Sequence, residues 1–150
     1  MKKIQVVVVG IDFSENLENN WELLKRLEFL KDVEIHLVHV SSLHNYSFGE
    51  NIHVPIYPSG EMKVIIEHSV LLKLNQLASE LLPLNSSHPI FAKCLFDKYP
   101  KKAFLEYTEK VGAQLVILTS GKKNPLSIRS FIQYQVQNSI ANVLVLKSQQ

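Results

Sequence analysis

Residues 4–14 read IQVVVVGIDFS, and this stretch decides the fold. The four valines at positions 6–9 form a continuous apolar run, which is typical of a strand buried on both faces in a parallel sheet covered by helices. The run ends at Gly10, and Asp12 follows two residues later. In open α/β sheets, ligands bind beyond the carboxyl ends of the strands, where the strand order reverses. We therefore expect Asp12 to lie at the functional edge of the sheet, after its central strand.

The length and composition of the chain indicate a single globular domain over residues 1–150. Hydrophobic residues make up 46% and charged residues 20%, as in ordinary folded domains. The formal net charge of +2 is too small to favour nucleic acid or a membrane surface as a partner. The single cysteine, Cys94, lies in an apolar run and is expected to be a buried, inert thiol. With no targeting segment and no run of membrane-spanning length, we expect a cytoplasmic protein.

The rest of the chain alternates strands with helices. The expected strands are residues 4–10, 33–40, 90–96, 115–118 and 142–146, the expected helices are residues 14–30, 61–82, 101–111 and 127–140, and residues 41–60 form the longest irregular stretch. Because parallel strands need right-handed helical crossovers, helices should cover both faces of the sheet. The predicted fold class is α/β, a three-layer sandwich with a five-stranded parallel sheet and four helices.

Several conspicuous side chains have structural interpretations. Trp21 falls on the apolar stripe of the first predicted helix and Val64 on that of the second, so both should face the core. His36 and His39 are three residues apart on one strand and should point to opposite faces, so they cannot hold one metal ion together. No other group has metal-ligand spacing, and we expect no metal site.

Five segments, in this order, resemble the universal stress protein (UspA-like) family over nearly the whole chain. They are VVVVGIDFSEN at residues 6–16, IHLVHV at 35–40, DKYPKKA at 97–103, LVILTS at 115–120 and NVLVLK at 142–147. Lys98 stands where the family usually has glycine. The resemblance implies an adenine-nucleotide alpha-hydrolase-like fold with strand order 3-2-1-4-5, which makes the first strand central.

The resemblance also implies which residues would contact a nucleotide. ATP-binding members carry a loop that reads Gly-x-x-Gly, nine residues, then Gly-Ser or Gly-Thr opening the last helix, and its glycines let backbone N–H groups approach the phosphates. In this sequence Thr119 and Lys122 replace the first two glycines, Arg129 replaces the third, and Ser130 matches the serine. The nucleotide-binding residues that the resemblance implies are Asp12, Val40, Thr119, Ser120, Gly121, Lys122, Arg129 and Ser130.

The missing glycines argue against tight ATP binding. A residue other than glycine forced into a left-handed conformation costs roughly 1–2 kcal/mol, so two or three such positions would reduce affinity by several factors of ten. Lys122, Lys123 and Arg129 could supply charge instead, although side chains on a loop must first be ordered. For Asp12, contact with a ligand and acceptance of backbone N–H bonds in its own turn both remain open.

These observations predict a universal stress-type regulatory protein that acts in the stress response by association. The sequence contains no motif for a catalytic triad, a metalloprotease or a phosphate loop, so we expect no enzyme. The resemblance implies a homodimer through the fifth strand, where Val143, Leu144, Val145 and Leu146 would form an apolar edge. We expect no tightly bound cofactor, and a partner protein that the sequence does not name.

Two alternatives remain. One is an adenine-nucleotide binder, of ATP or AMP, in which basic side chains take over from the glycines. The other is a receiver-like phosphoacceptor domain, in which Asp12, Asp97, Thr119 and Lys147 meet at the strand ends and Asp97 accepts a phosphoryl group in the presence of Mg²⁺.

Overall fold

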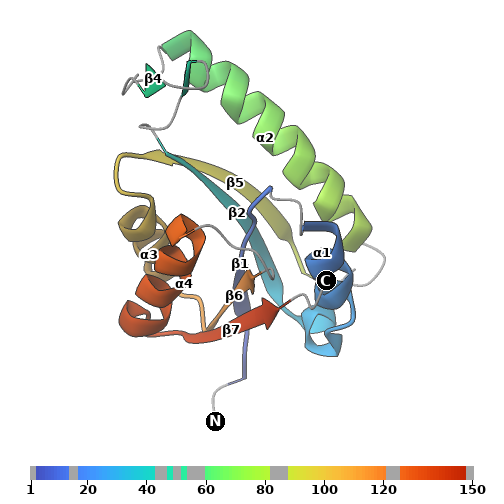
Figure 1. The fold of residues 1–150 in the computed structure, drawn as a ribbon. Coiled ribbons are helices and arrows are strands. Elements are labelled where there is room, and N and C mark those ends of the chain that lie inside the picture. The colour runs from blue at the N-terminus through green and yellow to red at the C-terminus, as the bar shows by residue number, and fades with distance from the viewer. Residues whose placement is uncertain are drawn as a thin grey trace.

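The computed structural model describes residues 3–13, 17–42, 47–48, 52–53, 60–81, 88–120 and 126–147 (Figure 1). It is the predicted three-layer α/β sandwich. Five strands form one sheet in the order β5-β2-β1-β6-β7, and every pairing in it is parallel. Counted along the chain, the strands of this sheet have the order 3-2-1-4-5, so the first strand is central as predicted.

Most elements lie within a few residues of their predicted positions. The strands of the sheet are β1 (Val6–Gly10), β2 (Glu34–Ser42), β5 (Ile90–Asp97), β6 (Leu115–Ser120) and β7 (Asn142–Lys147). The helices are α1 (Leu17–Lys25), the 3-10 helix η1 (Glu28–Asp32), α2 (Gly60–Leu81), α3 (Pro100–Lys110) and α4 (Leu126–Asn138). Where one helix was predicted over residues 14–30, the structure has α1 followed by the short helix η1. No helix in the described part of the chain is long and apolar enough to cross a membrane.

The stretch at residues 41–60 is less irregular than predicted. Strand β2 continues into it as far as Ser42, and β3 (Ser47–Phe48) pairs with β4 (Ile52–His53) as a separate antiparallel sheet. Helix α2 begins at Gly60. Residues 43–46, 49–51 and 54–59 lie outside the described part of the chain.

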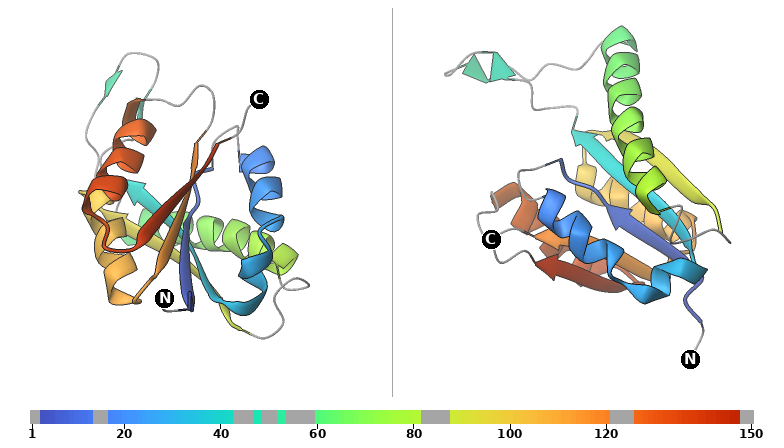
Figure 2. Two further views of the ribbon diagram at one scale, coloured as in Figure 1. Left: turned by 90° about the horizontal axis from the view of Figure 1, so that it is seen from below. Right: turned by 90° about the vertical axis from the view of Figure 1, so that its right-hand side faces the viewer.

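Helices α1 and α2 cover one face of the main sheet, and α3 and α4 cover the other (Figure 2). The core therefore has two parts. On the α1–α2 face, Trp21 packs in one cluster with Val7 and Val9 of β1. On the α3–α4 face, Phe104 packs in a second cluster with Val8. The alternation of these valines between the two clusters explains the continuous apolar run, because both faces of β1 are buried.

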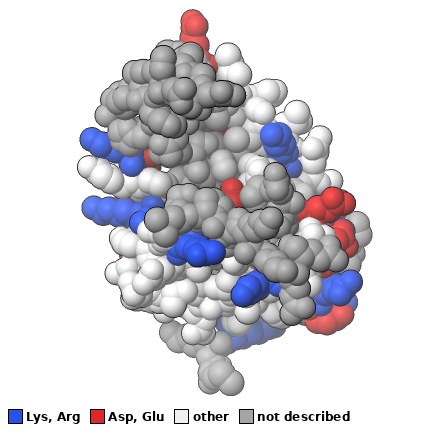
Figure 3. Space-filling model, in the orientation of Figure 1, with Lys and Arg blue, Asp and Glu red and all other residues white. Residues whose placement is uncertain are grey.

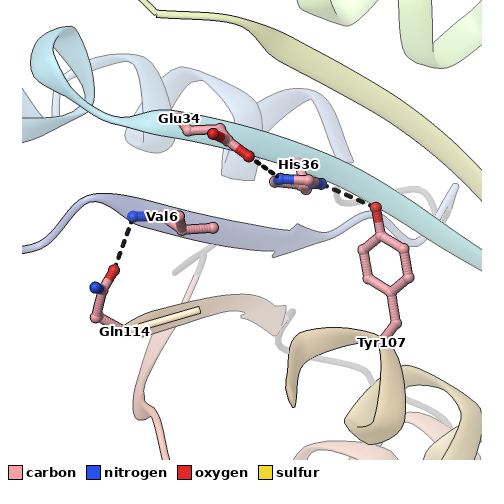
Figure 4. A network of polar contacts seen from close by, with 5 residues as sticks. All are labelled: Val6, Glu34, His36, Tyr107 and Gln114. Atoms are coloured by element: carbon pink, nitrogen blue, oxygen red, sulfur yellow. Dashed lines mark hydrogen bonds and ion pairs between the residues drawn. The ribbon is translucent and has the colours of Figure 1, made fainter. Parts of the chain in front are cut away.

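The central strand is also fixed at its amino end. The side-chain oxygen of Gln114, which directly precedes β6, accepts hydrogen bonds from the backbone N–H groups of Gln5 (3.0 Å) and Val6 (2.8 Å). Figure 4 shows the bond to Val6. At the other end of β1, Gly10 lies tightly against two buried side chains. A Cβ at this position would come within 2.9 Å of Leu118 Cδ2 and 3.2 Å of Phe104 Cζ.

The predictions for Trp21 and Cys94 are confirmed, and the one for Val64 is wrong. Trp21 is buried, and its indole N–H donates to Glu80 Oε2 at 2.5 Å. Cys94 is a buried free thiol, and burial raises its pKa. Val64, however, is 66% exposed. Helix α2 buries the stripe that includes Val70 and Leu74, and a position six residues before Val70 lies about 120° around the helix axis from it.

A buried polar network joins β2 to α3 (Figure 4). His36 is only 6% exposed and contacts Glu34 Oε1 through Nε2 (2.6 Å) and Tyr107 Oη through Nδ1 (2.9 Å). In the neutral ring, Nε2–H donates to the carboxylate and Nδ1 accepts from the phenol, so both nitrogens have partners. Burial raises the pKa of Tyr107, and the negative charge of Glu34 acts in the same direction. His39 lies on the opposite face, as predicted.

Replacement of Gly10 by alanine should destabilise the fold by about 1–2 kcal/mol, since overpacking at Leu118 and Phe104 outweighs the smaller entropy of the unfolded chain. Gly60→Ala is the matched control. Nothing lies within 4 Å of a Cβ at Gly60, so that variant should be neutral or slightly stabilised. Urea unfolding of both variants tests this, and equal stabilities would contradict the packing at Gly10.

Tyr107→Phe should lower the free energy of unfolding by about 1–3 kcal/mol, because it leaves Nδ1 of the buried His36 without its partner. Tyr99→Phe removes the same hydroxyl from a side chain that is 61% exposed, and it should have little effect. Chemical denaturation of the two variants compares them directly. A loss of stability in Tyr99→Phe as large as that in Tyr107→Phe would show that the His36 contact does not stabilise the fold.

Candidate functional site

The structure brings half of the predicted nucleotide-binding residues to one edge of the sheet. Asp12 follows β1, Val40 lies near the end of β2, and Thr119 and Ser120 are the last two residues of β6. Because β1 lies between β2 and β6, the carboxyl ends of these three strands are neighbours. Their proximity follows from the strand order, and their role in binding stays a prediction.

Two hydrogen bonds join the turn that carries Asp12 to β2. The Ile11 N–H donates to the Val38 carbonyl, and His39 Nδ1 donates to the Ile11 carbonyl, both at 2.8 Å. The ring of Phe13, on the other side of Asp12, lies 4.9 Å from that of His39. His39 thus contacts the residues on both sides of Asp12, Ile11 through a hydrogen bond and Phe13 through ring packing. In the sequence, the only sign of this role is the position of His39 near the end of a predicted strand.

The phosphate end of the predicted site differs from what the resemblance implies. Gly121 and Lys122 lie outside the described residues. Helix α4 begins at Leu126, directly after Pro125 in the sequence, so Arg129 and Ser130 are its fourth and fifth residues. Only the first N–H groups of a helix are free to bind an anion, and the Ser130 N–H lies beyond them. The last helix, predicted over residues 127–140, thus begins within one residue of its predicted start. Ser130 does not open it, unlike the serine of the family pattern that Ser130 matches.

The side chain of Ser130 has a partner that the sequence did not reveal. Lys101, in the first turn of α3, donates a hydrogen bond from Nζ to Ser130 Oγ. Gln135 Nε2 in turn donates to the Lys101 carbonyl at 2.8 Å. These contacts join α3 to α4 and place an ammonium group at the one serine that matches the nucleotide-binding pattern. No local feature of the sequence distinguishes Lys101 from the neighbouring Lys102.

Charge is unevenly distributed on this side of the molecule. In Figure 3, Lys and Arg side chains dominate the left of the view, on the side of α3, and acidic side chains are concentrated on the right, on the side of α1. The basic residues that α3, α4 and the turn before α3 contribute are Lys98, Lys101, Lys102, Lys110 and Arg129. Asp97, which precedes α3, accepts a hydrogen bond from the Tyr99 N–H at 2.7 Å. Near the amino end of α3, Lys98, Lys101 and Lys102 outnumber Asp97, whereas Glu106, Glu109 and Lys110 lie toward the other end of the helix.

The strand order contradicts the receiver-like alternative. Asp97 ends β5, and the strands β2 and β1 lie between β5 and β6, which carries Thr119. With strands spaced about 4.8 Å apart, the ends of β5 and β6 are separated by about 14 Å. Asp97 is too far from Thr119 to form a phosphoacceptor site with it. Within the described residues, no three His, Cys, Asp or Glu side chains are grouped so that they could hold a metal ion.

The predicted dimer interface is β7, the outer strand on one side of the sheet, and β5 is the outer strand on the other side. Within the described residues, β7 pairs with β6 on one side only. Val143 packs against the α3–α4 core, and Leu144 and Leu146 pack against the α1–α2 core. Together with Val145, all four remain partly exposed. The structure thus presents an apolar edge strand where the sequence predicted one.

Searches by sequence found no relative, since no family model and no curated protein matches this chain. Solved structures do match. UspA, a universal stress protein from Lactobacillus plantarum, has a TM-score of 0.66 at 13% identity, over 97% of this chain and 99% of that chain. A protein of the universal stress protein family from Burkholderia pseudomallei has a TM-score of 0.66 at 10% identity, over 97% of each.

A third match is a universal stress protein solved in complex with cAMP, with a TM-score of 0.63 at 14% identity, over 97% of this chain and 98% of that chain. At such identities the likeness concerns the fold. It spans nearly the whole of each chain, and the strand order agrees with the one that the sequence resemblance implied. The chain therefore has the fold of the universal stress proteins, and the resemblance seen in its sequence is confirmed at the level of the fold.

Proposed function

We propose that this chain is a regulatory protein of the universal stress type, which acts in the cytoplasm as a homodimer and works by association with a partner protein. It does not turn over a substrate, and it does not hold ATP tightly. The observation that carries the proposal is the edge strand β7. The proposed role in the stress response is supported by the fold and by the names of the structurally similar proteins.

The edge of β7 is suited to pairing with a second copy. An edge strand presents a row of unpaired backbone N–H and C=O groups, and proteins usually cover such a row or shield it with charge. Here residues 143–146 are all apolar. Pairing of β7 with its copy across a two-fold axis would extend the sheet and bury the same patch on both subunits.

Val145→Asp should weaken the dimer by tenfold or more, because the interface would have to desolvate a carboxylate in each subunit. Val145 suits the test because, among the four residues of the edge and within the described structure, it alone packs against neither core cluster. Ile65→Asp is the control, since Ile65 is exposed on α2, which packs over β5 at the far edge of the sheet. Light scattering over a range of protein concentrations measures the effect.

A wild-type protein that remains a monomer at high micromolar concentration would overturn the homodimer. Equal weakening by Val145→Asp and Ile65→Asp would place the interface elsewhere.

A second candidate function is the binding of an adenine nucleotide such as ATP or AMP. Two observations favour it. The turn at Asp12 is fastened by His39, and the end of β2 at Val40 is its neighbour in the sheet. One structurally similar protein was solved with cAMP. Against tight binding of ATP stand the glycines that the sequence lacks and the early start of α4, which leaves the Ser130 N–H inside the helix.

Protein purified without added nucleotide should therefore release much less than one equivalent of ATP or AMP when it is denatured. Absorbance at 260 nm and mass spectrometry of the supernatant measure the amount. The expected reason is that Thr119, Lys122 and Arg129 stand where the family pattern has the glycines that let backbone N–H groups reach the phosphates. Release of a full equivalent of either nucleotide would contradict the first proposal and establish the second.

A further inference from the structure

We propose that the outer edge of β5 binds an acidic segment of a partner protein, which adds to the sheet as a sixth, antiparallel strand. The proposal rests on the first proposed function in one respect, the association with a partner protein, and it deepens that function by naming a surface and a chemistry for the partner. It concerns the edge of the sheet that the homodimer through β7 does not use. The two interfaces can therefore be tested separately.

The outer side of β5 presents a row of backbone groups. Within the described residues, β5 pairs with β2 and with no other strand (Figure 1). The Ile35 N–H donates to the Pro89 carbonyl at 3.3 Å, and in a parallel pair the residues that face the neighbouring strand recur at every second position. Residues 91, 93 and 95 therefore turn their backbone groups toward β2, and residues 90, 92, 94 and 96 turn theirs away from it. An extended peptide can add to an edge of this kind.

Two exposed side chains lie along this edge on the side of α3. Leu95 packs in the α3–α4 cluster, and because side chains alternate along a strand, Phe91 and Lys93 point to the same face. Phe91 is 44% exposed, and its ring stacks on that of His36 with 4.8 Å between the centroids. Since His36 is buried and has a partner at each ring nitrogen, it gives Phe91 a fixed support. The edge thus offers an apolar contact and a cation two residues apart.

The charge of Lys93 indicates which partner fits the edge. Lys93 is exposed, and it takes part in none of the ion pairs within the described part of the chain. Glu34 on the same face is bound to His36, and Glu67 belongs to α2, which covers the other face. A lysine within an edge strand disfavours pairing with a second copy, because like charges would meet. Residues 143–146 of β7 carry no charge, so the two edges favour different partners.

An antiparallel strand would bring these side chains closest to those of the partner. Antiparallel pairing is slightly more stable per residue than parallel pairing. In it, residues 90, 92, 94 and 96 would form the hydrogen-bonded pairs. Phe91 and Lys93 would then fall in the other pairs, in which opposite side chains are closer. The partner residue opposite Lys93 would be acidic, and the one opposite Phe91, two positions later in the partner, would be apolar.

Titration of isotopically labelled protein with two seven-residue peptides, followed by NMR, tests the proposal. The first peptide reads Thr-Val-Thr-Glu-Thr-Phe-Thr, which places its glutamate opposite Lys93, and the second has lysine instead of glutamate. The first peptide should shift the amide signals of residues 90, 92, 94 and 96, and it should bind about 3-fold to 30-fold more tightly than the second. N-methylation of its two inner threonines, whose N–H groups would donate to β5, should abolish binding. N-methylation of its glutamate and phenylalanine should have little effect.

Lys93→Glu should reverse the preference, so that the lysine peptide binds more tightly than the glutamate peptide. Lys102→Glu is the matched control. It makes the same change in net charge at an exposed residue of α3 that lies 3.9 Å from Glu106 on its own helix, and it should leave the order of the two peptides unchanged. Thermal unfolding of both variants confirms that they are folded.

The proposal is overturned if neither peptide shifts the β5 amide signals at millimolar concentration, if both peptides bind equally, or if Lys93→Glu and Lys102→Glu have the same effect. Changes of the β5 signals with protein concentration alone would show that a second copy covers this edge, and they would also overturn it. Light scattering of the same samples measures the homodimer. A dimer that binds neither peptide contradicts this proposal alone, and a monomer that binds the first peptide contradicts the homodimer alone.

Discussion

The structure depends on the way the central strand is held. Both faces of β1 are covered, with Val7, Val8 and Val9 fully buried between two helix layers. Gln114 accepts a hydrogen bond from the Val6 N–H at the amino end of the strand, and His39 donates one to the Ile11 carbonyl in the turn after its carboxyl end. Because a shift by one residue would exchange valine for valine on both faces, burial alone does not set the register of β1. The close packing at Gly10 and the contacts of Gln114 and His39 distinguish one register from the next. The position of everything beyond Gly10 is fixed by these contacts.

Strand ends and helix starts meet at the carboxyl edge of the sheet next to β1, and different parts of the structure determine their positions. The base end is built from strand ends, so the sheet itself determines where Asp12 and Val40 lie. The anion end depends on where a helix starts and on which side chains reach it. Because α4 starts at Leu126, the backbone N–H of Ser130 lies inside the helix, and the Ser130 hydroxyl accepts a hydrogen bond from Lys101. The first proposal rests on neither end but on the edge strand β7, and the second rests on the base end at Asp12 and Val40.

The order of elements and strands could be predicted because long apolar runs and helical periodicity are local properties of the sequence. Val64 could not be placed correctly, since α2 carries apolar residues on more than one side and periodicity does not say which side meets the sheet. The roles of His39 and Lys101 come from contacts with residues 28 and 29 positions away. Such contacts arise only from packing, and no local pattern encodes them. At β7, in contrast, the apolar edge was visible in the sequence because an edge strand is recognised by its composition and its place in the strand order.

The central claim is that the apolar edge strand β7 pairs two copies of the chain. The most direct measurement is amide hydrogen exchange of isotopically labelled protein, followed by NMR at low and at high protein concentration. The account predicts that the outward-facing N–H groups of β7 exchange more slowly at high concentration, whereas the amides of β1, in the interior of the sheet, exchange at the same rate at both. Exchange of the β7 amides at one rate over the whole concentration range would contradict it.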